Sequence, residues 1–180
     1  MPEVAEVRIS GNFANLIGAG ENKIFNSIQI SPLSKVKTDF SEYNQSQFGI
    51  DVLMRGKETL VRIERFDPGT FGYVKNLSIS MGMSGHWVYY DPKDPLSAQT
   101  HVHTHLRFIE QTGNILGIMD VRRFAKWKFV DGFSKNRGAC PLSDFANFKS
   151  QLLSMYGTPS WKKPIYEVLM DQFLFNGVGN

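Results

Sequence analysis

The sequence predicts an α+β fold, with an N-terminal helix, then a two-sheet β-sandwich, then a helical region. Residues 2–17 carry apolar side chains at helical spacing. Residues 23–130 consist of short apolar and β-branched runs separated by turn residues, which is typical of a sandwich. Polar residues and glycines then dominate 131–140. We therefore expect a β-sandwich domain at 1–130, a linker at 131–140 and an incomplete helical domain at 141–180.

The composition indicates a globular protein with a sizeable core. Of the 180 residues, 42% are hydrophobic and 14 are phenylalanine. The single cysteine, Cys140, excludes an internal disulfide and favours a reducing compartment. No run of about 18 apolar residues occurs, so no membrane span is expected. The net charge of +3 permits an acidic polymer as partner without requiring one.

The first helix has sequence signals at both ends. Pro2 suits a first helical turn, because the N–H that proline lacks would have no partner within the helix. Glu3 and Glu6 place negative charge at the positive end of the helix dipole. Gly18 and Gly20 end the helix.

The strands are predicted from apolar runs that lie between turn residues. Arg55-Gly56-Lys57 separates two of these runs and predicts a hairpin. Residues 111–114 predict a second tight turn. The apolar runs lie at 24–30, 52–54, 60–63, 77–90, 103–108 and 115–129.

Two further helices are predicted after the linker. Ser143 and Asp144 can cap a helix that runs to about Met155. Pro164 opens a second helix that continues through Phe173. The apolar face of the first of these helices would contain Phe145, Phe148, Leu152 and Leu153. A glycine-rich turn follows the second helix directly, so we expect the natural protein to continue beyond Asn180.

The N-terminus offers a nucleophile. Removal of Met1 would leave Pro2 as a secondary amine with a pKa of about 8, roughly two units below that of lysine, so part of it is neutral at pH 7. Neutral amines attack carbonyl-like carbons and form Schiff bases. Met-Pro starts are common in proteins, and Glu3 and Glu6 have an ordinary role at a helix start. The chemical interpretation therefore depends on the remaining motifs.

Six motifs occur in one order along the chain. They are Met1-Pro2-Glu3, Arg55-Gly56-Lys57, Met81-Gly82-Met83-Ser84-Gly85, the run 103–108 (HTHLRF), the run 120–124 (DVRRF) and the run 171–180 (DQFLFNGVGN). Together they resemble the formamidopyrimidine-DNA glycosylase and endonuclease VIII family of base-excision repair enzymes, and its Nei-like 1 branch most. The resemblance covers essentially the whole chain but about two thirds of the family's usual length. Two departures are Val4-Ala5 at the family's proline-containing pair and Ser80 at a position where many relatives have a basic residue.

The resemblance implies a set of catalytic residues. Pro2 would attack the sugar C1′ of a damaged nucleotide, and Glu3 would protonate the sugar ring oxygen. Lys57 would hold a phosphate beside the lesion and assist elimination. Glu6 would either support catalysis or only stabilise the helix start. A turn lysine in solvent is the ordinary alternative for Lys57.

The resemblance also implies DNA-binding residues. Met83, Arg122 and Phe124 would enter the duplex and fill the space of an extruded nucleotide. Asn180 would contact a phosphate at the end of the glycine-rich turn. The alternative for Met83 and Phe124 is burial in the core, and the alternative for Asn180 is a helix C-cap.

The histidines of the run 101–105 raise the question of a metal site. Alternate positions on a strand can place two ligands on one face. No cysteine or carboxylate cluster lies nearby, and the resemblance implies a structural strand here. We therefore expect no metal in this chain, although relatives often carry a zinc finger further along.

The implied function is a bifunctional DNA glycosylase and abasic-site lyase that excises oxidised pyrimidines and ring-opened purines and cleaves by β,δ-elimination. This chemistry needs no organic cofactor. The implied partner is double-stranded DNA with oxidised bases or abasic sites, bound by a monomer inside the cell, in the nucleus or the bacterial nucleoid. Residues 141–180 would begin a helix–two-turns–helix domain. Two alternatives stay open, namely a weak or inactive damaged-DNA-binding relative and an unrelated N-terminal-proline tautomerase.

Overall fold

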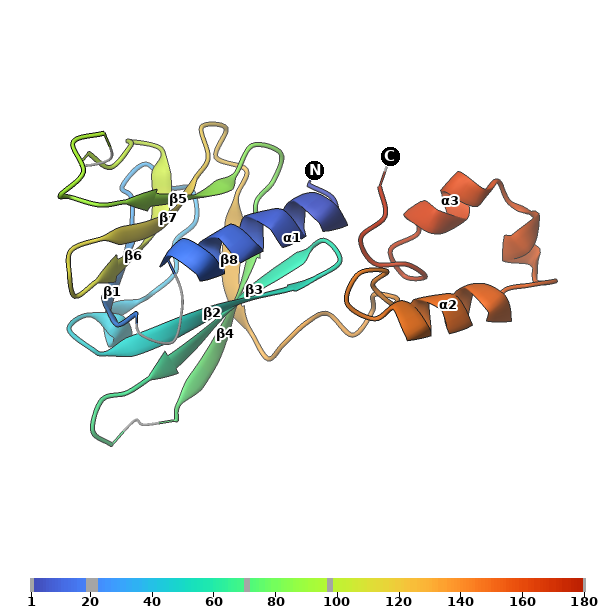
Figure 1. Cartoon of the computed structure of the whole chain (residues 1–180), viewed down its shortest axis with the longest axis horizontal. Helices are drawn as coiled ribbons and strands as arrows, with labels where there is room; N and C mark the ends of the chain where they lie inside the picture. The colour runs from blue at the N-terminus through green and yellow to red at the C-terminus, as the bar shows by residue number, and fades with distance from the viewer. Residues whose placement is uncertain (1, 19–22, 70–71, 97–98, 180) are drawn as a thin grey trace.

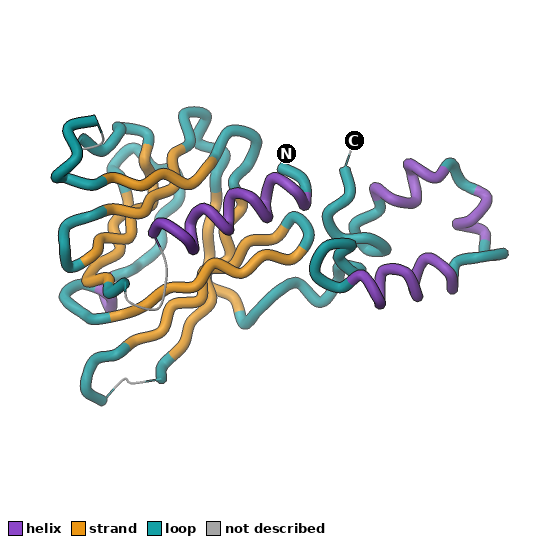
Figure 2. The backbone as a smooth tube through the Cα atoms, viewed as in Figure 1, coloured by secondary structure: helices purple, strands orange, loops and turns teal. Residues whose placement is uncertain are grey.

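The computed structural model describes residues 2–18, 23–69, 72–96 and 99–179. A helix, eight strands and two further helices follow one another in chain order (Figures 1 and 2). Short 3-10 turns lie at Ser41–Tyr43 and Pro159–Lys162. The elements are α1 (Val4–Phe13), β1 (Phe25–Ile30), β2 (Phe48–Arg55), β3 (Glu58–Arg65), β4 (Val74–Ser80), β5 (His86–Tyr90), β6 (Thr104–Glu110), β7 (Ile115–Met119), β8 (Lys126–Val130), α2 (Phe145–Ser154) and α3 (Ile165–Met170). The predicted α+β fold is confirmed.

The strands form a bent antiparallel sheet. Their order is β5-β7-β6-β1-β2-β3-β4-β8, and β1 and β2 share a single register pair, Phe25 with Phe48. The sheet bends at this pair into two layers of four strands each. Hydrogen bonding thus joins the two halves of the predicted sandwich into one sheet.

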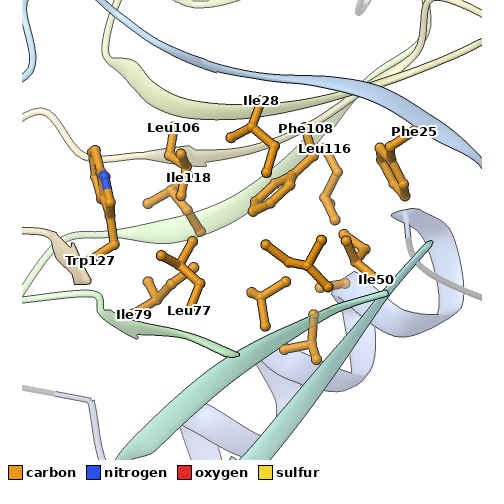
Figure 3. Close-up of a cluster of buried hydrophobic side chains, with 14 of the residues drawn as sticks. Phe25, Ile28, Ile50, Leu77, Ile79, Leu106, Phe108, Leu116, Ile118 and Trp127 are labelled. Carbon is orange, nitrogen blue, oxygen red and sulfur yellow. The ribbon is translucent and has the colours of Figure 1, made fainter. Parts of the chain in front are cut away.

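The core lies between the two layers. Figure 3 shows side chains of β1, β6 and β7, such as Phe108 and Ile118, pointing toward Ile50 of β2 and Leu77 of β4. Phe108, Leu77 and Ile118 have no exposed surface. Burial of each large apolar side chain contributes about 1.5–3 kcal/mol to stability, so this inner surface accounts for the alternating pattern of the strands.

Helix α1 is fixed against β2 by close packing and by one amide side chain. A Cβ atom on Gly11 would lie 1.6 Å from the Sδ atom of Met54, so the Met54 side chain packs directly on the backbone of α1. The Asn15 side chain donates to the carbonyl oxygen of Val52 and accepts from its N–H, each at 2.8 Å. The N-terminal end of α1 therefore lies at the hairpin end of β2. The helix was predicted over 2–17, but α1 begins at Val4, and a π-helical turn continues it over 14–18.

The C-terminal region has a small cluster of its own. Met155, Val168 and Phe175 are buried together, with Phe148 and Leu152 packed against them. The predicted apolar face of α2 is only half correct, because two of its members are exposed. These are Phe145, 62% exposed, and Leu153, 64% exposed.

Two predicted details of this region are wrong. Asp144 occupies the N-cap position of α2, but its side chain makes no capping bond; it accepts instead from the Asn147 amide at 2.9 Å. The last helix ends at Met170 and not at Phe173, because residues 171–174 form a turn closed by hydrogen bonds back to Asp171. Within the described residues, no helix has the length and apolar character needed to cross a bilayer.

Candidate functional site

Strand register brings three turns to one edge of the sheet, which is here the edge formed by the ends of the strands. Thr59, near the start of β3, pairs with Ile79, near the end of β4. Ser80 then pairs with Lys126 at the start of β8. The β2–β3 hairpin, the turn 81–85 and the loop 120–125 therefore leave the sheet at the same edge, although they are far apart in sequence.

The N-terminal residues lie beside the C-terminal turn. Pro2 and Glu3 are half-buried, and the N–H of Val4 donates to the carbonyl oxygen of Gly177 at 3.1 Å. A Cβ atom on Gly179 would lie 2.2 Å from the Oε1 atom of Glu3, so the carboxylate packs directly on this backbone. Figure 1 shows the start of α1 next to the C-terminal segment.

Glu6 caps the helix that follows Pro2. Its Oε2 atom accepts from the backbone N–H of Glu3 at 2.9 Å, and its side chain is exposed. This bond satisfies one of the unpaired donors at the helix start. The geometry gives Glu6 a structural role, which was one of its two predicted roles.

Gly177 joins the helix start to the predicted hairpin. Its φ of 118° lies in the region that favours glycine. A Cβ atom here would lie 2.7 Å from the Cβ of Val4 and 2.8 Å from the Cα of Gly56. The hairpin that carries Lys57 and the turn that carries Pro2 and Glu3 thus meet across one glycine.

A buried amide holds the hairpin in place. The Oδ1 atom of Asn176 accepts from the N–H of Lys57 at 3.2 Å, and its Nδ2 atom donates to the carbonyl oxygen of Arg55 at 3.2 Å. The same Nδ2 atom donates to Oε2 of Glu58 at 2.9 Å. Asn176 has no exposed surface. Sequence reasoning missed this residue, because an asparagine before glycine is equally typical of an ordinary turn.

The segment between β8 and α2 is bound to the same hairpin. Glu58 forms an ion pair with Arg55 at 2.9 Å and approaches Arg137 at 3.9 Å. Its Oε1 atom also accepts from the N–H of Ser134 at 3.0 Å. The buried thiol of Cys140 accepts from the N–H of Gly56 at 3.2 Å. Residues 131–140 are therefore fixed by polar contacts and do not behave as a free spacer.

The three predicted DNA-inserting residues are exposed and neighbouring. Met83 is 64% exposed and Phe124 is 48% exposed, and Arg122 is exposed as well. A Cβ atom on Gly82, whose φ is 64°, would lie 2.7 Å from the Cβ of Phe124, so the turn 81–85 and the loop 120–125 are in contact. The core alternative for Met83 and Phe124 is wrong. We call this pair of loops the wedge.

Asp120 joins the two loops of the wedge by hydrogen bonds. Its carboxylate is buried and accepts from the backbone N–H groups of Arg122 at 3.1 Å, Phe124 at 2.6 Å and Ala125 at 2.7 Å. It also accepts from the hydroxyl of Ser84 in the neighbouring turn. Burial alone would raise the pKa of Asp120, but these four hydrogen bonds stabilise the carboxylate and hold the pKa below its ordinary value of 3.8.

The histidine run supports the wedge. His105 is buried on β6, and its Nε2 atom lies 3.1 Å from the carbonyl oxygen of Asp120. Burial lowers the pKa of His105, and this hydrogen bond opposes the shift. Among the described residues, no group of three histidine, cysteine or acidic side chains is arranged to hold a metal ion. Asn180 lies outside the described residues, so its predicted phosphate contact stays a prediction.

We predict that Asn176→Ala destabilises the protein through the hairpin. The substitution removes the acceptor of the Lys57 N–H and one donor to the Arg55 carbonyl, and loss of buried hydrogen-bond partners typically costs about 1–3 kcal/mol of unfolding free energy. Chemical denaturation measures the loss. Asn147→Ala, on the exposed surface of α2, is the matched control and should change stability by less than about 0.5 kcal/mol. Equal losses of stability in the two variants would contradict the role of Asn176 in holding the hairpin.

A second prediction concerns the pH dependence of Asp120. Because its folded-state pKa is lowered, its contribution to stability is present above the ordinary pKa and is lost as pH falls through the lowered value. The unfolding free energy of the wild type should therefore exceed that of Asp120→Asn most at neutral pH, and the gap should narrow at pH values below about 4. Asp51→Asn, exposed on β2, is the control. A difference in unfolding free energy between the wild type and Asp120→Asn that does not change with pH would contradict the lowered pKa of Asp120.

Comparison with known proteins shows the family of this chain. The protein-family model named formamidopyrimidine-DNA glycosylase N-terminal domain matches residues 1–127 of this chain. The chain is 30% identical to Endonuclease 8-like 1 of Mus musculus and 31% identical to formamidopyrimidine-DNA glycosylase of Streptococcus agalactiae. Both alignments cover all of this chain, but 45% and 63% of the two relatives, respectively. The chain thus spans between about half and two thirds of the length of these relatives.

A solved structure shows the same fold. The Lactococcus lactis formamidopyrimidine-DNA glycosylase, in complex with DNA that contains an oxidised pyrimidine, aligns with a TM-score of 0.71 at 23% identity. The alignment covers 99% of this chain and 64% of that one. Since the family model alone matches residues 1–127 of the 180, this chain belongs to the formamidopyrimidine-DNA glycosylase family.

Proposed function

We propose that this chain carries the catalytic centre of a bifunctional DNA glycosylase and abasic-site lyase. The observation that carries the proposal is the convergence at one sheet edge of Pro2, Glu3 and the Lys57 hairpin with the exposed wedge. The substrate is double-stranded DNA with oxidised pyrimidines, ring-opened purines or abasic sites. The protein acts as a monomer, in the nucleus of a eukaryote or the nucleoid of a bacterium.

The chemistry begins at the amine of Pro2. The neutral nitrogen attacks C1′ of the damaged nucleotide, and an N–C bond forms as the glycosidic bond breaks. The base leaves with the electron pair and is neutralised by a proton, while the Pro2 nitrogen loses its own proton. The sugar ring then opens as its oxygen takes a proton from Glu3, and the sugar is held as an iminium ion on Pro2. Loss of a proton from C2′ lets the C3′–O bond break, and a second elimination releases the 5′ phosphate.

The surrounding residues serve this chemistry by position. The Lys57 ammonium binds a phosphate beside the lesion, with its backbone fixed by Asn176. Met83 and Phe124 supply apolar contacts to the bases left behind by the extruded nucleotide, and Arg122 donates to the opposite base. Glu6 acts through the helix cap. Asn180 is proposed to add a phosphate contact from the glycine-rich turn.

The two alternative functions from the sequence analysis agree with the structure to different extents. A tautomerase does not agree with the family match or with a chain that begins with a helix and continues as a sandwich. A damaged-DNA-binding relative without turnover has the same wedge, so chemistry on DNA must separate it from an enzyme.

We predict that borohydride reduction in the presence of abasic-site DNA traps a covalent complex at Pro2. The iminium ion on Pro2 is the reducible species, and intact mass with peptide mapping locates the adduct. A variant with one residue added before Pro2 is the control, because its proline nitrogen becomes an amide and loses its nucleophilicity. DNA binding without trapping would favour the non-catalytic relative. Equal trapping by the extended variant would exclude Pro2.

Glu3→Gln should separate base excision from strand cleavage. Excision needs a proton as the sugar ring opens, whereas a preformed abasic site already offers an aldehyde. Loss of a general acid costs about 10²- to 10⁴-fold in rate, so excision of an oxidised base should fall by this factor while cleavage of abasic DNA falls much less. Single-turnover assays on both substrates measure the two rates. Equal losses on both substrates would contradict the role of Glu3.

A further inference from the structure

A groove with several basic residues lies along β8. It has a volume of about 490 Å³. Because β8 ends the strand order, no further strand among the described residues covers its outer edge. The polar residues that line the groove are Lys35, Ser78, Ser80, Arg123, Lys126 and Lys128.

The charge of the groove is unbalanced. Four of its lining residues are cations and none is acidic. Among the described residues, none of Lys35, Arg123, Lys126 and Lys128 takes part in an ion pair. Cations that face one groove repel each other, and a bound anion would reverse the sign of this interaction. The groove is thus complementary to a ligand with several negative charges.

The spacing of the cations fits a polymer better than a single anion. Lys126 and Lys128 are exposed and pair with Ser80 and Ser78 across β4 and β8. Alternate residues of a strand lie about 6.6 Å apart. One DNA strand carries a phosphate for every ~3.4 Å of the helix axis, so two lysines at this spacing can contact two phosphates of the same strand. The serine hydroxyls add neutral donors beside the two ammonium groups.

The groove begins where the wedge ends. Arg123, which lines the groove, lies between Arg122 and Phe124 of the wedge. Its φ of 58° is in the left-handed region, which non-glycine residues rarely adopt, and its N–H donates to the carbonyl oxygen of Asp120 at 3.1 Å. One loop therefore supplies both the wedge and the first cation of the groove.

We propose that this groove binds the sugar–phosphate backbone of duplex DNA that flanks the lesion. The DNA footprint then extends from the wedge along β8, and Lys126 and Lys128 contact phosphates that the wedge does not reach. The identity of the ligand rests on the proposed function, whereas the charge and spacing of the groove do not.

The test uses an undamaged duplex of about three helical turns, so no base chemistry is involved. Each phosphate contact that is lost should lower the slope of log Kd against log salt by about 0.9. Lys128→Ser should lower this slope by about one unit relative to the wild type, and the double variant Lys126→Ser/Lys128→Ser by about two. Lys93→Ser, on the exposed β5–β6 loop, removes the same charge as Lys128→Ser and should leave the slope unchanged.

Further measurements keep the two proposals apart. Borohydride trapping at Pro2 with saturating abasic DNA should be the same in wild type and Lys93→Ser, because Lys93 belongs neither to the Pro2 turn nor to the groove. A slope change in Lys128→Ser without trapping in the wild type would support the groove and overturn the proposed function. Equal slopes for Lys128→Ser and Lys93→Ser, or a wild type that does not bind the duplex, would overturn the groove. Thermal unfolding confirms that the variants are folded.

Discussion

The candidate site depends on one buried amide. Asn176 binds both sides of the β2–β3 hairpin, and its own N–H donates to the carbonyl oxygen of Ala139 at 3.0 Å. A buried polar side chain is stable only when its hydrogen bonds are made, so this residue permits one position of the hairpin relative to the C-terminal turn. The next residue, Gly177, contacts the start of α1. Pro2, Glu3 and the hairpin that carries Lys57 are therefore positioned by the same four-residue turn, residues 176–179.

The wedge depends on a second buried polar side chain, the carboxylate of Asp120. The Asp120 carboxylate replaces the strand ladder as the hydrogen-bond partner for three backbone N–H groups of the loop 120–125. Its bond to Ser84 joins this loop to the turn 81–85. The buried carboxylate holds the two loops in the arrangement in which Met83 and Phe124 are exposed. The proposed insertion into a duplex requires this exposure.

The positively charged side chains of two regions differ in whether they form ion pairs. The cations near the hairpin, Arg55 and Arg137, are engaged by Glu58 and so have a structural role. The cations along β8 have no such partner among the described residues. A net charge of only +3 conceals this difference, because Glu58 offsets part of the positive charge near the hairpin, whereas among the described residues no ion pair offsets the charge along β8.

The sequence by itself predicted most elements of this protein and its candidate reactive residues. The hairpin at Gly56 and the sandwich strands follow from local periodicity and turn chemistry, which act over a few residues, and six ordered motifs indicated the family. Only the tertiary structure decided the roles of Asn176, Asp120 and Glu58, because each acts on backbone groups distant in sequence or on loop geometry that no local pattern encodes. The single pair between Phe25 and Phe48 likewise comes from the bend between the layers. Register, and not periodicity, brought the site to one edge.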